Sequence, residues 1–102
     1  MKIYNVTPSS AWQSAIQRMD RLYPKLPPAQ QHLLEFAVWT GATIEDLACQ
    51  MNKSPSTIRN QMYSIREKAA EVGYDKYPTW HRILIDAGIY FAYCQQIPVT
   101  KS

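Results

Sequence analysis

The chain has 102 residues, of which 46% are hydrophobic and 12% are aromatic. This length predicts one domain, and the apolar content is enough for a packed core, which excludes general disorder. Eleven Lys and Arg against eight Asp and Glu give a net charge of +3, so a polyanionic partner is permitted without being required.

The patterns that mark other classes of protein are missing from the sequence. No apolar run is long enough to span a bilayer, and the first ten residues do not resemble a secretory signal, so we expect a soluble, cytoplasmic protein. Neither the histidines nor the cysteines, Cys49 and Cys94, are spaced like metal ligands or a disulfide framework. No pair of residues is spaced like a nucleophile and its base. We therefore expect no metal, no cofactor and no catalytic residue.

Helical periodicity predicts an all-α bundle of about five helices, forming a single domain over residues 1–102. An N-terminal helix is expected over 8–23, capped at Thr7 and Pro8. Proline and Ser or Thr caps, followed by Gly or Asn at the other ends, predict the remaining helices over 28–40, 44–51, 55–71 and from Thr79 to about residue 94. Residues 95–102 are expected to form a flexible tail.

The third and fourth helices are separated by a turn of only three residues, 52–54, a spacing typical of a helix-turn-helix. Apolar residues of the fourth helix form a core face at Ile58, Met62, Ile65 and Ala69. The outward face then carries polar and basic residues, namely Ser56, Arg59, Asn60, Tyr63 and Arg66. Residues 53–68 contain four basic side chains and one acid, whereas residues 41–52 contain only two acids, Glu45 and Asp46.

This outward face favours duplex DNA as the partner. Arg59 can read guanine through two hydrogen bonds, Asn60 can read adenine in the same way, and Tyr63 can reach a base edge or a phosphate. Ser54, Ser56 and Thr57 lie at the start of the helix, where the helix dipole and free N–H groups favour a phosphate.

The segments Gly41-Ala-Thr-Ile-Glu-Asp-Leu-Ala48 and Ser54-Pro-Ser-Thr-Ile-Arg-Asn-Gln-Met62 resemble the LuxR/GerE-type helix-turn-helix. The resemblance implies a four-helix DNA-binding domain over 26–94 and bases contacted by Arg59, Asn60 and Tyr63. Phosphate contacts are expected from Thr43, Ser54, Ser56, Thr57, Gln61, Arg66 and Lys68. It also implies a homodimer through the last helix, whose surplus apolar surface lies at Ile83, Leu84, Ala87, Tyr90 and Phe91.

Region 4 of sigma factors is also similar, over Leu22 to Lys68, and ranks second because the last helix continues past its pattern. The favoured hypothesis is a sequence-specific, homodimeric transcriptional regulator that reads the major groove with helix 55–71. The alternative is a protein of the same fold that binds another regulator or an RNA polymerase subunit without contacting DNA. An enzyme is the least favoured reading.

Two further expectations concern single residues. Asp86, on an apolar helix, is expected at the surface or in an ion pair with Arg82 one turn earlier. The three tryptophans, Trp12, Trp39 and Trp80, are expected to be core residues rather than a platform for stacking bases.

Overall fold

The computed structural model describes residues 10–74 and 77–96. Over these residues it confirms the all-α helix-turn-helix bundle, in which each predicted helix is present to within a few residues. The expected cap at residues 7–8 and residues 97–102 of the expected tail lie outside the described residues, whereas residues 95 and 96, also assigned to the tail, belong to the last helix. The elements are α1 (Ser10–Leu22), a short 3-10 helix η2 (Tyr23–Lys25), α2 (Pro28–Thr40), α3 (Ile44–Met51), α4 (Pro55–Val72) and α5 (Trp80–Gln96).

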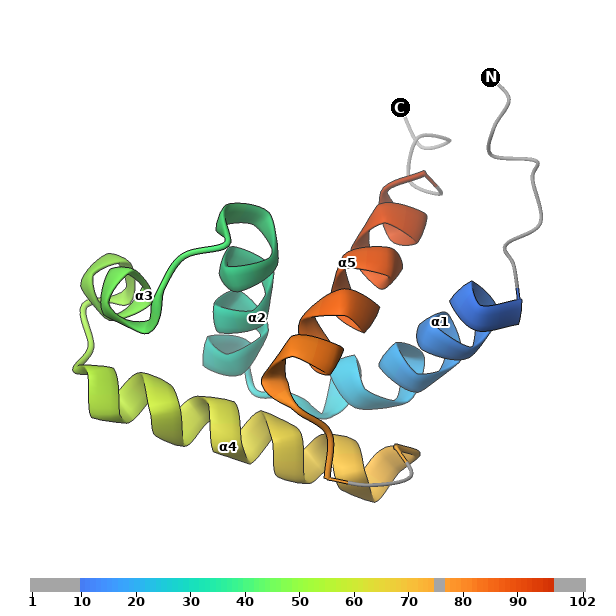
Figure 1. Ribbon diagram of the computed structural model, residues 1–102, viewed down its shortest axis with the longest axis horizontal. Coiled ribbons are helices and arrows are strands. Elements are labelled where there is room, and N and C mark those ends of the chain that lie inside the picture. Colours follow the sequence, from blue (N-terminus) through green and yellow to red (C-terminus); the bar gives the residue numbers. More distant parts are fainter. Residues whose placement is uncertain (1–9, 75–76, 97–102) are drawn as a thin grey trace.

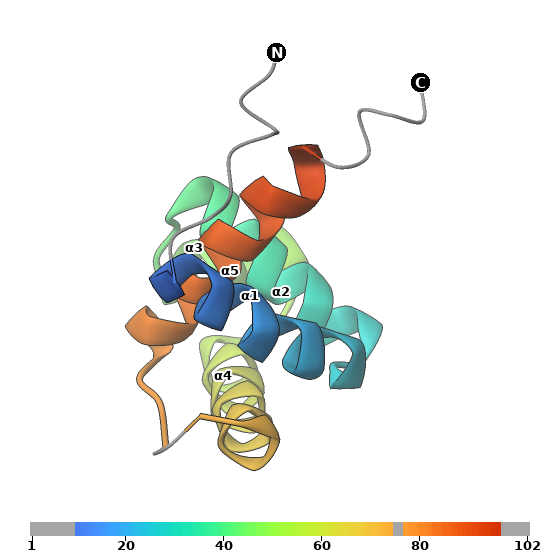
Figure 2. The same ribbon diagram turned by 90° about the vertical axis from the view of Figure 1, so that its right-hand side faces the viewer.

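Helix α4 lies along one side of the molecule, and the other helices pack on a single side of it (Figure 1). α3 contacts the first half of α4, α2 stands over its middle, and α1 and α5 meet near its second half. The view at right angles shows α1, α2 and α5 together above α4 (Figure 2). One long face of α4 is therefore not covered by any of the described helices.

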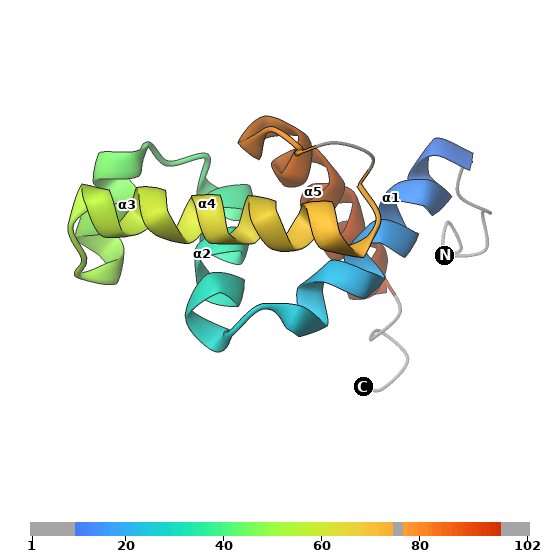
Figure 3. The same ribbon diagram turned by 90° about the horizontal axis from the view of Figure 1, so that it is seen from below.

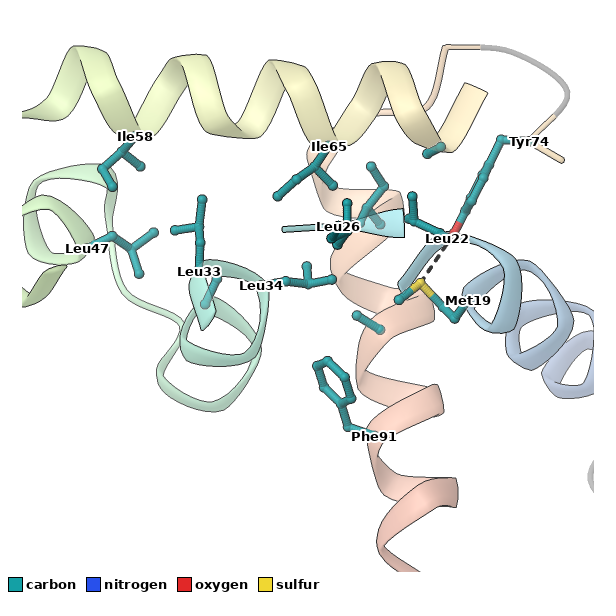
Figure 4. Close-up of a cluster of buried hydrophobic side chains, with 14 of the residues drawn as sticks. Met19, Leu22, Leu26, Leu33, Leu34, Leu47, Ile58, Ile65, Tyr74 and Phe91 are labelled. Carbon is teal, nitrogen blue, oxygen red and sulfur yellow. Dashed lines mark hydrogen bonds between the residues drawn. The ribbon is translucent and has the colours of Figure 1, made fainter. Parts of the chain in front are cut away.

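The core is continuous from the helix-turn-helix to α1. Figure 4 shows Ile58 and Leu47 facing Leu33 at one end, and Met19 beside Tyr74 at the other. From α4 the core receives Ile58, Ile65 and Ala69, each at most 1% exposed, whereas Met62 is half-buried. Burial of these apolar groups fixes the rotation of α4 about its axis, and so fixes which side chains point outward.

The turn of the helix-turn-helix is held by caps at both of its helices. Thr43 Oγ1 accepts a hydrogen bond from the Asp46 amide at 3.1 Å, and Ser54 Oγ accepts one from the Thr57 amide at 3.2 Å. Asn52 ends α3 in the left-handed conformation, with φ of 58°, a geometry that asparagine tolerates better than most residues. Asn52 and Ser54, which lie in the turn itself, set the angle at which α4 leaves α3.

The expectation that all three tryptophans are core residues is wrong for two of them. Trp12 is 49% exposed and Trp39 is 56% exposed, whereas Trp80 is half-buried against the core. α2 carries apolar residues on almost every side, but the other helices cover only the side that bears Leu33, Leu34 and Ala37. Trp39 therefore lies at the rim, where its ring stacks on Phe91 with 6.4 Å between centroids.

Asp86 is not a surface residue, because only 2% of it is exposed. Its ion pair with Arg82 is present, with Nε and Oδ1 3.5 Å apart. Two partners distant in sequence complete the site: Arg18 Nε lies 3.1 Å from Oδ2, and the Tyr74 hydroxyl donates to Oδ2 at 2.7 Å. This cluster links α1 and α5 to Tyr74, which lies two residues beyond the end of α4.

Candidate nucleic-acid interface

The outward face of α4 is open along its length, as the view from below shows (Figure 3). Ser56, Arg59 and Asn60 are exposed, and Tyr63 is 54% exposed. These four side chains project from two successive turns, because residues three and four apart share one face of a helix. The structure thus brings the three predicted base-contacting residues together on one surface.

The first turn of α4 groups hydroxyl side chains at the N-terminus of the helix. The Ser54 and Thr57 hydroxyls are 2.9 Å apart and share a hydrogen bond, while Ser56 is exposed beside them. Pro55 occupies the first helical position, where its missing N–H costs nothing. The partial positive charge of the helix N-terminus therefore faces solvent next to three hydroxyl groups.

On one flank of α4, Arg59 and Tyr63 border a hollow of about 180 Å³. Ile44 and Met62 supply its apolar lining, and Arg66 closes it. Ile44 follows Thr43 directly, so the N-terminus of α3 lies on the same flank as Arg59.

The Arg66 guanidinium is already engaged within the chain. Its Nε donates to the carbonyl oxygen of Pro78 at 2.7 Å, and its central carbon lies 4.4 Å from the centre of the Tyr77 ring. The same carbon is 5.6 Å from the centre of the Tyr63 ring. Sequence reasoning treated Arg66 as one more outward cation, since the partners from the segment before α5 could not be foreseen.

On the opposite flank, Gln61 and Lys68 point toward α2 instead of lying among the exposed residues. Gln30, which is buried, donates from Nε2 to Gln61 Oε1 at 2.8 Å and accepts from Lys68 Nζ at 3.4 Å. Lys68 Nζ also donates to Ser64 Oγ at 2.8 Å. The predicted phosphate set is therefore divided between two flanks and the N-terminal end of α4.

Two exposed acids, Glu45 and Asp46, lie in the first turn of α3. Their negative charge interacts favourably with the positive end of that helix dipole. The same charge also lies next to Thr43, one of the predicted phosphate contacts. The basic groups of the helix-turn-helix that remain exposed are Lys53 and Arg59, so positive charge is concentrated on α4 and the turn.

In the described part of the chain, no group of three or more His, Cys, Asp or Glu lies close enough to hold a metal ion. None of the helices described is both long enough and apolar enough to cross a membrane.

The expected dimer surface on α5 needs correction. Ile83 and Ala87 are fully buried and Phe91 is 8% exposed, because they pack against the chain's own core. Tyr90 and Leu84 are half-buried. The apolar residues that α5 does leave accessible include Ile85, which is 48% exposed and which sequence reasoning did not select.

Two helices joined by a three-residue turn, the second presenting a polar and basic face, define a helix-turn-helix domain of the DNA-binding type. The family model described as Sigma-70, region 4 matches residues 16–68, just over half of the chain. The protein belongs to that family, whose helix-turn-helix acts in transcription. No curated protein and no solved structure matches the chain significantly. Of the two resemblances in the sequence, the comparison supports the sigma-factor one, and the LuxR/GerE assignment is not confirmed.

Proposed function

We propose that this protein binds duplex DNA in a sequence-specific manner and regulates transcription, with α4 in the major groove. Arg59 and Asn60 contact base edges and Tyr63 reaches a base or a phosphate one turn further along. The observation that carries the proposal is the shared exposure of these three side chains on the open face of α4, opposite the buried Ile58 and Ile65.

The phosphate contacts in this proposal come from the N-termini of α3 and α4. Thr43, Ser54, Ser56 and Thr57 lie there, on the flank and end that also carry Arg59. Backbone amides and hydroxyls at a helix N-terminus are well suited to hold a phosphate group. Gln61 and Lys68 face α2, so they are left out of the proposed contact set.

The test is fluorescence-anisotropy titration of a random-sequence duplex and of a duplex pool enriched by selection, each at two salt concentrations. We expect tighter binding to the enriched pool and a loss of affinity at higher salt. Arg59→Ala and Asn60→Ala should each cost about 1 to 3 kcal/mol on the enriched sites and relax base preference at one position.

Lys25→Ala is the matched control, because it removes one exposed positive charge in η2, outside the helix-turn-helix. It should leave sequence preference unchanged. Wild-type protein that fails to bind at low salt, or Arg59→Ala and Asn60→Ala variants with the affinity of wild type, would contradict the proposed role of α4.

A protein partner is the second candidate function, and Trp39 is the observation that favours it. Its half-exposed ring borders an open groove of about 520 Å³ between α2 and α3, where Phe36 and Met51 add apolar surface. Exposed aromatic surface of this kind is typical of protein interfaces. The partner would be another regulator or an RNA polymerase subunit. Trp39→Ala would then abolish complex formation without changing DNA affinity.

We also propose that the protein forms a homodimer through α5, by way of other residues than most of those expected from the sequence. The accessible apolar surface there consists of Leu84, Ile85 and Ile89, beside Trp12 of α1, and it borders a hollow of about 500 Å³. A homodimer would bury the exposed Ile85 and Trp12, since an isologous interface uses the same patch of both copies.

A further inference from the structure

Arg66 has three partners within the chain that together fix the orientation of its guanidinium. Its Nε donates to Pro78 O at 2.7 Å, and the Tyr77 and Tyr63 rings lie 4.4 and 5.6 Å from its central carbon. Both ring distances fall within the range in which a cation is attracted to an aromatic face. The outward face of α4 that carries Arg59, Asn60 and Tyr63 is called the reading face below. Arg66 thereby connects this reading face to the segment that leads into α5.

We propose that Arg66 is a positioning residue of the DNA interface: it holds the Tyr63 ring at the edge of the reading face and fixes the Tyr77–Pro78 segment against α4. The inference rests on the proposed function and deepens it, since it assigns to Arg66 a task other than the phosphate contact expected from the sequence. DNA is contacted by Tyr63, and Arg66 acts through it.

The chemistry of the contacts explains why arginine is needed at this position. A planar guanidinium can donate through Nε to a carbonyl while its faces remain available to aromatic rings, whereas an ammonium group is a compact and strongly hydrated charge. A phosphate contact, by contrast, needs mainly positive charge, which lysine also supplies. Arg66→Lys therefore separates the two roles, because it keeps the charge and loses the planar geometry.

Tyr63 is 54% exposed, and the Arg66 guanidinium, 5.6 Å from the ring centre, is the cation that its ring contacts. Tyr77 is 46% exposed and contacts the same guanidinium from a different segment, with its ring centre 4.4 Å from the central carbon. Without the Arg66 contacts, both rings are free to adopt other rotamers. The Tyr63 side chain must then lose conformational entropy when DNA binds, which lowers the affinity.

The experiment measures affinity for a selected duplex, and its salt dependence, in wild-type protein, Arg66→Lys, Tyr77→Ala and Tyr63→Leu. We expect Arg66→Lys and Tyr77→Ala each to weaken binding about three- to tenfold, with the same salt slope as wild type. In the Arg66→Lys background, Tyr63→Leu should cost clearly less than in the wild type, because the two residues act as a unit.

Arg21→Lys is the matched control for a general loss of structure. Arg21 Nε also donates to a backbone carbonyl at 2.7 Å, that of Val72 at the far end of α4, so the substitution removes the same kind of bond away from Tyr63. We expect Arg21→Lys to lower thermal stability and to leave DNA affinity unchanged. Thermal unfolding of every variant shows which of them are folded at the temperature of the binding assay.

The inference is overturned if Arg66→Lys binds as wild type does, which would leave Arg66 as a simple cation. It is equally overturned if the loss of affinity in the double variant equals the product of the losses for Arg66→Lys and Tyr63→Leu to within a factor of about two. Sites that act independently give this result. Either result still requires DNA binding by the wild type. Absence of wild-type binding would instead refute the proposed function itself.

Discussion

Replacing Asp86 with Ala removes a carboxylate that three other side chains share. Asp86 is 2% exposed, and its Oδ2 lies 3.1 Å from Arg18 Nε and 2.7 Å from the Tyr74 hydroxyl. Arg82 approaches the other oxygen at 3.5 Å, from a side chain that is 54% exposed. The substitution leaves Arg18 Nε without this acceptor and leaves the Tyr74 hydroxyl only the weak contact to Met19 Sδ at 3.8 Å, while we expect the backbone of α5 to stay helical.

The expected loss follows from how far each partner is from water. Breaking a buried ion pair by removing one member costs about 3 to 5 kcal/mol, whereas an exposed pair such as the one with Arg82 contributes only about 0 to 1 kcal/mol. The Arg18 side chain is 18% exposed and can turn partly to solvent, which favours the low end of the range. We therefore expect a loss of about 3 kcal/mol in the free energy of unfolding, or about 12 to 24 °C in Tm for a domain of this size.

Thermal and urea unfolding followed by circular dichroism at 222 nm measure this loss. Glu71→Ala is the control, because Glu71 is an exposed acid on α4 and its removal changes the net charge equally; it should stay within about 0.5 kcal/mol of wild type. A loss below about 1 kcal/mol for Asp86→Ala would refute the reasoning, as would an equal loss in the control.

Two further predictions concern pH and oligomeric state. Burial first, and then the hydrogen bond to Asp86, raise the pKa of Tyr74 above its ordinary value; the stability this provides is complete below a pH of about 10 and is lost as the pH rises further, because the unfolded chain releases the proton first. Tyr74→Phe should therefore flatten the alkaline fall in Tm, and an unchanged slope would contradict the prediction. Ile85→Glu should convert a dimer to a monomer in sedimentation velocity, since a charge would enter the proposed apolar contact; a wild-type protein that is monomeric at high concentration would exclude the dimer.

The helices and the helix-turn-helix could be predicted from sequence because their causes are local. Caps such as Thr43 and Ser54 act within three residues, and Asn52 needs only its own backbone to end α3. The apolar stripe of α4 likewise predicted that Arg59, Asn60 and Tyr63 point outward, since periodicity alone decides which residues lie opposite a core face. Family membership depends on the same local pattern: the sequence predicted two families that share it, of which the comparison supports region 4 of sigma factors.

Only the tertiary structure decided where the remaining polar and aromatic groups lie. Asp86 can be buried because Arg18, 68 positions away in the sequence, forms a hydrogen bond and an ion pair with it. Arg66 is held by a hydrogen bond to Pro78, in the segment that precedes α5. Trp39 stays 56% exposed because its ring meets Phe91 of α5 at the surface and is not enclosed by the described helices. Each of these outcomes depends on which helices pack together, and periodicity describes only one helix at a time. The sequence alone therefore determined which surface of α4 faces outward, and packing between helices decided how that surface is supported.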